Sequence, residues 1–216
     1  MATLGPDEFT GDPAWKVVRT LRDGSSITIR AIQPEDRDEL RREFAKTSPE
    51  TRYLRFLGVV GELTDEMLTY LTCVDQRDHI ALVATMTSPD LKSERGVGVG
   101  RVIRLKDAPD VAEAAITVVD DMHKLGIGSA LAFEMARAAK ARGIRTIRAE
   151  VLEGNAAMRG ILENAGARRV DTGDQPGTLS YDIAIEQGPP ASSIVDVLRG
   201  AAQTMAMSIR KLVPPE

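Results

Sequence analysis

The pattern in this chain with the clearest chemical meaning is a glycine-bearing loop that joins an apolar stretch to a helix. The apolar stretch covers residues 114–119, and the loop reads His-Lys-Leu-Gly-Ile-Gly-Ser over residues 123–129. Unpaired N–H groups and the positive end of the helix dipole make a helix N-terminus a binding place for phosphate groups. Gly126 and Gly128 allow the backbone to approach such an anion closely. The loop therefore predicts a cofactor that carries phosphate.

Two well-known nucleotide-binding loops do not fit this pattern. The chain contains no Gly-x-x-x-x-Gly-Lys-Ser/Thr stretch, which a P-loop requires. A dinucleotide fingerprint needs a third glycine three residues after Gly128, where the chain has Leu131. Taken alone, the loop could also be a plain helix start with packing glycines. A nucleotide-binding α/β domain is the weaker alternative.

A carboxylate on the strand before the loop supplies the second piece of chemistry. Glu113 lies among Ala112, Ala114 and Ala115, and a charged side chain in an apolar strand is costly unless it is paired or used. A lysine amine is mostly ammonium at neutral pH and must lose a proton before it attacks an acyl group. Because a carboxylate can accept that proton, Glu113 is the leading candidate for a general base. The alternative is a strand-edge glutamate that faces water.

Other reactive side chains carry weaker signals. Glu150 lies on the next strand with Arg148 on the same face, where a structural salt bridge is favoured over catalysis. Cys73 has no paired base in the sequence and is expected to be a buried apolar thiol. Neither His79 nor His123 is assigned to catalysis, because a lone histidine is more often structural. No His/Cys cluster has metal-ligand spacing, so we expect no metal.

The elements that must position these residues read as a run of strands followed by alternating strands and helices. Asp23-Gly24 between two β-type stretches predicts a hairpin over Trp15 to Ile32. The expected helices cover residues 36–46, a segment from Ser48, 64–72, 129–142 and a short helix closed by Gly166; the further strands cover 80–86, 97–105, 112–119, 146–152 and 179–185. This order predicts an α/β fold with a mixed sheet flanked by helices.

The chain is expected to have three parts. Residues 1–14 read as a flexible tail, residues 15–187 as one domain, and residues 188–216 as an added amphipathic helix after Pro189-Pro190. The added helix is expected to pack on its own domain, and dimerisation or partner docking are the alternatives. A homodimer therefore stays open.

Composition excludes several classes of protein. The chain has 216 residues, enough for one domain with a real core, and its net charge of −4 argues against a nucleic-acid binder. A single cysteine, Cys73, permits no internal disulfide. No apolar run approaches the length of a membrane span, and the N-terminus lacks a signal-peptide core. We expect a cytoplasmic protein that does not enter a membrane.

The loop also has a counterpart in a known family. The run Val118-x4-His123-x2-Gly126-x-Gly128 resembles the acyl-CoA-binding motif of the GNAT acetyltransferases, which that family writes Gln/Arg-x-x-Gly-x-Gly/Ala. Residues 150–158 and 163–167 resemble the family's second cofactor segment, a strand, an Asn, a short helix and a Gly. Asp120-Asp121, the phrase "EVL..N..M" and residues 48–56 are similar to the bacterial Pat-type protein-lysine acetyltransferases. The resemblance covers roughly Leu21 to Ile185.

This resemblance implies a GNAT fold and acetyl-CoA as the cofactor. In Pat-type enzymes the general-base Glu lies in an Ala-Glu-x-Ala stretch, here at Glu113. The backbone of Ile116 would polarise the thioester carbonyl, that of Val118 would pair with pantetheine, and Asn155 would bind the pantetheine arm or cap a helix. His123 takes the place of the family's Gln. The N–H groups that would cradle the pyrophosphate belong to Lys124, Leu125, Gly126, Ile127, Gly128 and Ser129.

Three departures from the family pattern limit what can be carried over. His123 replaces the usual Gln, Leu125 replaces the common Arg or Lys, and Leu162 occupies the place of a Tyr general acid, so no tyrosine acid is assigned. The resemblance implies acetyl transfer to lysines of proteins, with an acyl-CoA synthetase among the candidate partners. Acetylation of a small amine or a protein N-terminus, and a non-catalytic acyl-CoA-binding regulatory module, are the alternatives.

Overall fold

The computed structural model describes residues 9–46, 61–87, 94–154, 156–164, 166–172 and 176–185. The strands are β1 (Lys16–Thr20), β2 (Ser26–Ala31), β3 (His79–Thr87), β4 (Glu94–Leu105), β5 (Ala108–Val118), β6 (Thr146–Leu152), β7 (Arg168–Val170) and β8 (Thr178–Ala184). The helices are α1 (Arg37–Lys46), α3 (Asp65–Thr72), α4 (Ile127–Ala141) and α5 (Ala156–Asn164), with 3₁₀ turns η1 (Pro34–Asp36) and η2 (Asp120–Met122). The predicted C-terminal helix lies outside the described residues.

The described strands form one mixed sheet in the order β1-β2-β3-β4-β5-β6-β8-β7. Neighbouring strands pair antiparallel except β5 and β6, which run parallel. A parallel pair needs a crossover connection, and here the crossover is α4. The predicted α/β class with a mixed sheet is confirmed.

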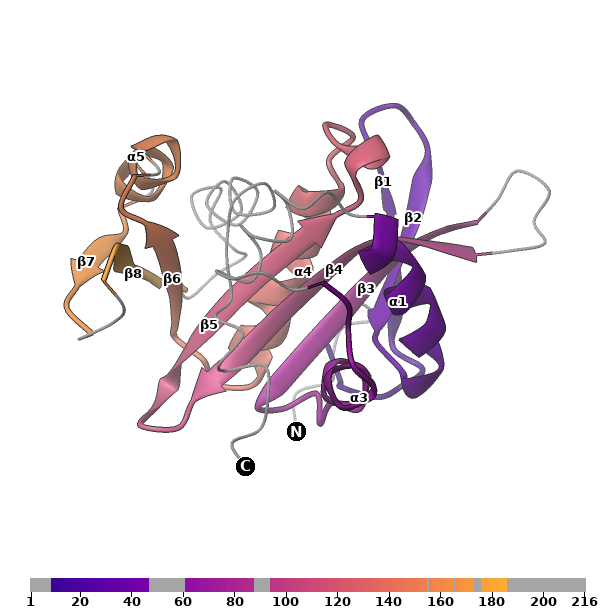
Figure 1. Ribbon diagram of the computed structural model, residues 1–216, viewed down its shortest axis with the longest axis horizontal. Helices are drawn as coiled ribbons and strands as arrows, with labels where there is room; N and C mark the ends of the chain where they lie inside the picture. The colour runs from indigo at the N-terminus through magenta and orange to yellow at the C-terminus, as the bar shows by residue number, and fades with distance from the viewer. Residues whose placement is uncertain are drawn as a thin grey trace, which may run out of the picture.

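Helices cover the two faces of the sheet. Helix α4 packs on one face, against β3, β4 and β5, while α1 and α3 lie on the other (Figure 1). The alternation of side chains along β5 divides between the two faces: Ala114 and Ile116 belong to the core under α4, whereas Ala115 belongs to a smaller cluster with Leu68 and Leu71 of α3. Odd-numbered residues of β5 therefore face α1 and α3.

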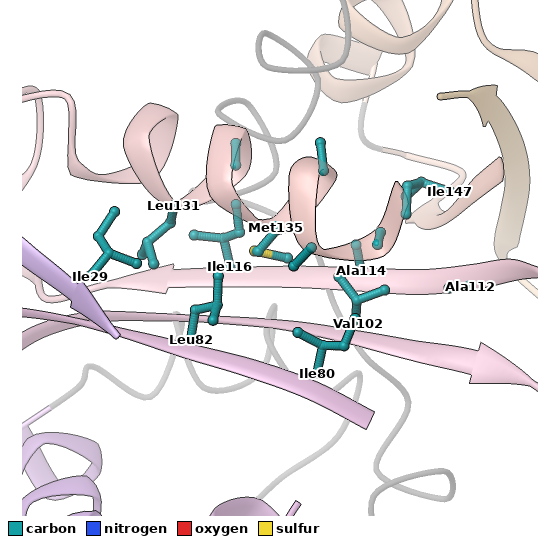
Figure 2. Close-up of a cluster of buried hydrophobic side chains, with 14 of the residues drawn as sticks. Ile29, Ile80, Leu82, Val102, Ala112, Ala114, Ile116, Leu131, Met135 and Ile147 are labelled. Carbon is teal, nitrogen blue, oxygen red and sulfur yellow. The ribbon is translucent and has the colours of Figure 1, made fainter. Parts of the chain in front are cut away.

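The core under α4 is closely packed. Leu131 and Met135 of α4 meet residues of β2 to β6, as Figure 2 shows for Ile29, Leu82 and Ile116. Glycines on β4 permit this approach. A Cβ added at Gly100 would lie 2.1 Å from the sulfur of Met135.

Several local predictions agree with the structure. The hairpin turn places Gly24 at φ +85°, a conformation that glycine adopts without a steric penalty. Thr64 caps α3 by accepting a hydrogen bond from the N–H of Met67 at 3.2 Å. Helix α4 begins at Ile127, two residues earlier than predicted. The short strand β7 was not predicted, since three residues carry too little periodicity to stand out.

The predicted tail over residues 1–14 is too long at its C-terminal end. Phe9 is only 3% exposed and packs edge-to-face on Trp15, with ring centroids 5.0 Å apart. The Arg142 guanidinium lies 5.4 Å from the Phe9 ring and donates to the carbonyl of Thr10. A single aromatic residue in a Gly/Pro-bearing stretch gives no periodic signal, and here tertiary packing holds it.

Candidate active site

The two parallel strands β5 and β6 pair only at their beginnings. Val111, Ala112 and Glu113 face residues 146–148, and no pairing between these two strands follows in the described residues. Figure 1 shows β6 leaning away from β5 beyond this point. The sheet therefore opens along the C-terminal half of β5.

The backbone of β5 presents alternate residues to this opening. The N–H of Val119 donates to the carbonyl of Val97 of β4, and the carbonyl of Asp110 accepts from the N–H of Arg145, the residue before β6. Because N–H and C=O groups alternate in direction along a strand, the even-numbered residues of β5 face the β6 side. The backbone groups of Ile116 and Val118 consequently face the opening.

His123 is tied to this strand. Its Nε2 lies 3.1 Å from the carbonyl oxygen of Val118, and 3.9 Å from a carboxylate oxygen of Asp120. The imidazole thus fixes the loop to the end of β5.

The glycine-bearing loop ends in an uncapped helix. Gly126 is the N-cap of α4 with φ +101°, and Lys124 also has a positive φ, +68°. The first intrahelical bond runs from the N–H of Ala130 to the carbonyl of Gly126 at 3.0 Å. The N–H groups of Ile127, Gly128 and Ser129 therefore precede the hydrogen-bonded part of the helix, and no side chain caps Gly126.

The start of α4 also contains a hydroxyl group that lacks a partner. Ser129 Oγ is buried and finds no hydrogen-bond partner among the described residues. A buried polar atom without a partner costs about 1–3 kcal/mol, so such atoms in native proteins usually bind a ligand or water. The uncapped N–H groups together with this hydroxyl fit the diphosphate of a nucleotide-type cofactor.

One cation beside the loop was not predicted. Arg22, in the β1–β2 turn, donates its N–H to the carbonyl of Leu125 at 3.3 Å, and its side chain passes near Gly126. It lies about a hundred residues away in sequence, so no local pattern could have pointed to it. On the other side, Arg95 is not available to an anion because it forms a bidentate ion pair with Asp121 at 2.8 and 3.0 Å.

Glu113 lies at the narrow end of the opening. It is 6% exposed, it is the last residue of β5 that pairs with β6, and it faces α3 with the other odd-numbered residues. Its partner across the parallel pair is Arg148. Arg148 forms a bidentate ion pair with Asp182 of β8, at 2.7 and 2.9 Å.

A buried polar group flanks Glu113 on the same face. Arg101 of β4 is 1% exposed, and its Nη1 lies 3.2 Å from His79 Nε2. Burial, with the Arg101 charge as the second cause, lowers the pKa of His79 to about 3 against an opposing effect of Asp75. His79 is therefore neutral at physiological pH. The ring of Tyr70 on α3 lies 5.0 Å from the His79 ring.

A cavity of about 250 Å³ lies on this face, between α1 and the sheet. Its floor is formed by Val83, Val99 and Thr117, with Phe44 of α1 above and Arg101 at one side. The Thr117 hydroxyl is buried and has no hydrogen-bond partner in the described part of the chain. Glutamates at 39, 43 and 94 also line the cavity.

The remaining predicted residues divide into two groups. Asn155 and the front cluster at residues 48–56 fall outside the described residues. Cys73 is exposed at the C-cap of α3, so the expectation of a buried thiol is wrong.

Within the described ranges no three His, Cys, Asp or Glu side chains are grouped as metal ligands, and no helix there has the length and apolarity to cross a membrane.

Comparison with known proteins identifies the family. A family model described as acetyltransferase (GNAT) domain matches residues 26–168. The chain belongs to the GNAT acetyltransferases. The match includes the strand β5, the glycine-bearing loop, α4 and β6, which are the elements that form the opening.

Individual relatives agree with this assignment. An acetyltransferase of Pseudomonas aeruginosa is 31% identical over 142 residues, which cover 66% of this chain and 75% of that protein. Acetyltransferase Pat of Mycolicibacterium smegmatis is 29% identical over 192 residues, which cover 88% of this chain and 56% of that protein. The crystal structure of the GNAT domain of S. lividans PAT matches with a TM-score of 0.69 at 28% identity, over 80% of this chain and 99% of that domain.

The family fixes the reaction class and the donor. This GNAT protein is an N-acetyltransferase that uses acetyl-CoA, and the uncapped start of α4 with the buried Ser129 hydroxyl fits the diphosphate of that donor. Leu125 and His123 stand where the family often has a cation and a glutamine. The backbone N–H groups, Lys124 and Arg22 can meet a phosphate charge at the loop.

Proposed function

We propose that this protein transfers the acetyl group of acetyl-CoA to lysine side chains of other proteins in the cytoplasm, with Glu113 as the general base. The observation that carries the proposal is the position of Glu113. It is a buried carboxylate at the point where β5 and β6 part, on the same face as the cavity under α1.

The chain's own groups divide the work of binding the donor. Acetyl-CoA supplies the acetyl group as a thioester. The N–H groups of residues 124–129 and the Ser129 hydroxyl bind the diphosphate, and Arg22 adds a positive charge beside them. The Val118 N–H binds the pantetheine arm, a role that Asn155 shares by resemblance to the family.

Two further groups act at the reacting atoms. The Ile116 N–H donates to the acetyl carbonyl oxygen, where negative charge grows as the amine attacks. Glu113 accepts the proton that the acceptor ammonium must lose, directly or through one water. The new C–N bond forms as the C–S bond breaks. The nitrogen releases its second proton to solvent, and the sulfur leaves as a thiolate that takes up a proton from solvent.

The acceptor is proposed to be a lysine for two reasons. The resemblance to Pat-type protein-lysine acetyltransferases extends over most of the chain. The cavity next to the opening has an apolar floor, which suits the long aliphatic stem of a lysine. An acyl-CoA synthetase is a candidate partner, and a homodimer is compatible with these features.

The test is acetylation of a panel of cytosolic proteins, acyl-CoA synthetases included, with modified sites read by peptide mass spectrometry. Glu113→Gln keeps the shape of the side chain and removes its basicity, while Glu35→Gln at the exposed turn η1 is the matched control. We expect lysine acetylation to fall about 100-fold or more in Glu113→Gln, with acetyl-CoA binding retained in calorimetry. Equal rates for the two variants would reject Glu113 as the base.

The same experiment separates the alternatives. Turnover with polyamines or peptide N-termini but with no protein lysine would move the acceptor to a small amine or an N-terminus. Acetyl-CoA binding without any turnover, unaffected by Glu113→Gln, would indicate a non-catalytic binding module.

A further inference from the structure

Arg101 is a permanently charged side chain with almost no access to water. It is 1% exposed, and among the described residues it is the largest side chain that is fully buried. A guanidinium stays protonated at every physiological pH, and burying a charge is costly unless an opposite charge and hydrogen bonds compensate it. The buried position of Arg101 therefore calls for a carboxylate nearby.

The strand register shows where this guanidinium points. Arg101 of β4 is opposite Ala81 on β3 and Ala115 on β5. Its Nη1 nevertheless reaches His79, which is opposite Ile103, two residues further along β4. The side chain thus extends along β4 toward the row that contains Ile103.

Glu113 is in that same row. It is opposite Ile103 on the other side of β4, so His79 and Glu113 are the two diagonal neighbours of Arg101 that lie in the row of Ile103. Diagonal neighbours lie about 7–8 Å apart, within reach of a long side chain. The small side chain of Ala115, directly beside Arg101, leaves this path clear.

The surroundings indicate that Glu113, not His79, supplies the opposite charge. A guanidinium can only donate, so His79 Nε2 accepts and the imidazole is neutral with its proton on Nδ1. Burial raises the pKa of Tyr70, and the Arg101 charge lowers it while the Glu113 charge raises it. The charges of Arg101 and Glu113 therefore both affect the pKa of Tyr70, with opposite signs.

From this geometry we propose that Arg101, oriented by His79, is a positioning residue for Glu113: it pairs with the buried carboxylate and fixes its place at the opening between β5 and β6. The inference rests on the proposed role of Glu113 as general base. A guanidinium presents its N–H donors in a fixed planar arrangement, so a carboxylate that pairs with it is held in one direction. Because a guanidinium does not titrate, the pairing serves the base over the whole physiological pH range.

The test compares Arg101→Met and Arg101→Lys with Arg19→Met. Arg19 pairs with the buried Glu134 on the α4 face at 2.6 Å, so Arg19→Met removes an ion pair away from the opening. We expect Arg101→Met to lower kcat about 10- to 100-fold with the KM for acetyl-CoA unchanged, and Arg101→Lys to recover part of the loss. Arg19→Met should lower the melting temperature and leave kcat intact.

A double-mutant cycle with Glu113→Gln completes the test. If the two residues pair, Arg101→Met lowers the melting temperature, and the double variant recovers most of that loss because neither charge is left alone. In the Glu113→Gln background, Arg101→Met should lower kcat no further. Additive effects in both cycles, or an unchanged kcat in Arg101→Met, would overturn the pairing. Full turnover in Glu113→Gln would reject the proposed role of Glu113 as base. The melting temperatures of the cycle would still show whether Arg101 and Glu113 pair.

Discussion

Glu113 of β5 and Arg148 of β6 face each other at the last position where the two parallel strands pair. Arg148 forms a bidentate ion pair with Asp182 of β8, so the closed end of the opening is crossed by a row of charges that reaches from β5 to β8. Such a row closes the sheet on one side of Glu113 and leaves the opening on the other. Glu113 is thereby fixed on a rigid strand and not on a loop, which favours the precise position that its proposed role as base requires.

Gly126 offers a direct test of the donor site. Its φ of +101° strains any residue with a Cβ by about 1–2 kcal/mol, and a carboxylate there would also repel a diphosphate. We expect Gly126→Ala to weaken acetyl-CoA binding by a few-fold and Gly126→Asp by more than 10-fold, measured by calorimetry. The alanine variant separates strain from charge. Equal affinity in Gly126→Asp and the parent protein would place the diphosphate elsewhere.

Ser129 should affect stability and binding in opposite directions. Its buried hydroxyl lacks a partner in the described part of the chain, so Ser129→Ala removes an uncompensated polar atom and should leave the free enzyme as stable or up to about 1 kcal/mol more stable. The same change removes one donor to the diphosphate and should weaken acetyl-CoA binding about 5-fold. Thermal unfolding with and without acetyl-CoA measures both effects. A variant that is less stable and binds equally well would assign the hydroxyl a purely structural role.

Gly100 tests how closely α4 packs on the sheet. A Cβ at this position would lie 2.1 Å from Met135 Sδ, so Gly100→Ala must displace the methionine and should cost about 1–3 kcal/mol of unfolding free energy. Adding Met135→Ala to Gly100→Ala should leave the double variant no less stable than Met135→Ala alone. Gly160→Ala in α5 is the matched control, because a Cβ there meets nothing within 4 Å and should be neutral or stabilising. Urea unfolding measures all four variants.

Sequence patterns predicted the elements that carry strong local signals. The Asp23-Gly24 hairpin, the buried strand from Ile80 and the strand–loop–helix unit around Gly126 all combine period and turn chemistry within a short window. Glu113 stood out for the same reason, since a charge among alanines contradicts the apolar pattern of its strand. These are features that one segment of chain determines by itself.

The features that sequence reasoning missed depend on contacts between distant segments. Arg22 reaches the loop from a turn about a hundred residues earlier, and Phe9 is buried only because Trp15 and Arg142 meet it. Arg101 shows no pattern of its own in β4. Its importance appears only when the register places His79 and Glu113 on two of its diagonals.

His79 makes the stability of the fold depend on pH in a calculable direction. Its pKa is lowered from 6.5 to about 3 in the folded protein, first by burial and then by Arg101, while the unfolded chain keeps the ordinary value. Below pH 6.5 the unfolded chain therefore binds a proton that the folded protein does not, and the free energy of unfolding falls as the pH falls toward 3. Above pH 6.5 this contribution is complete. The free energy of unfolding changes by at most about 1.4 kcal/mol per pH unit, and by about 2 kcal/mol in total between pH 7.5 and 5.

His79→Gln keeps a hydrogen-bond acceptor for Arg101 and removes the titration, so its melting temperature should fall less steeply than that of the parent protein over this range. Parallel curves for the two proteins would contradict a neutral, buried His79.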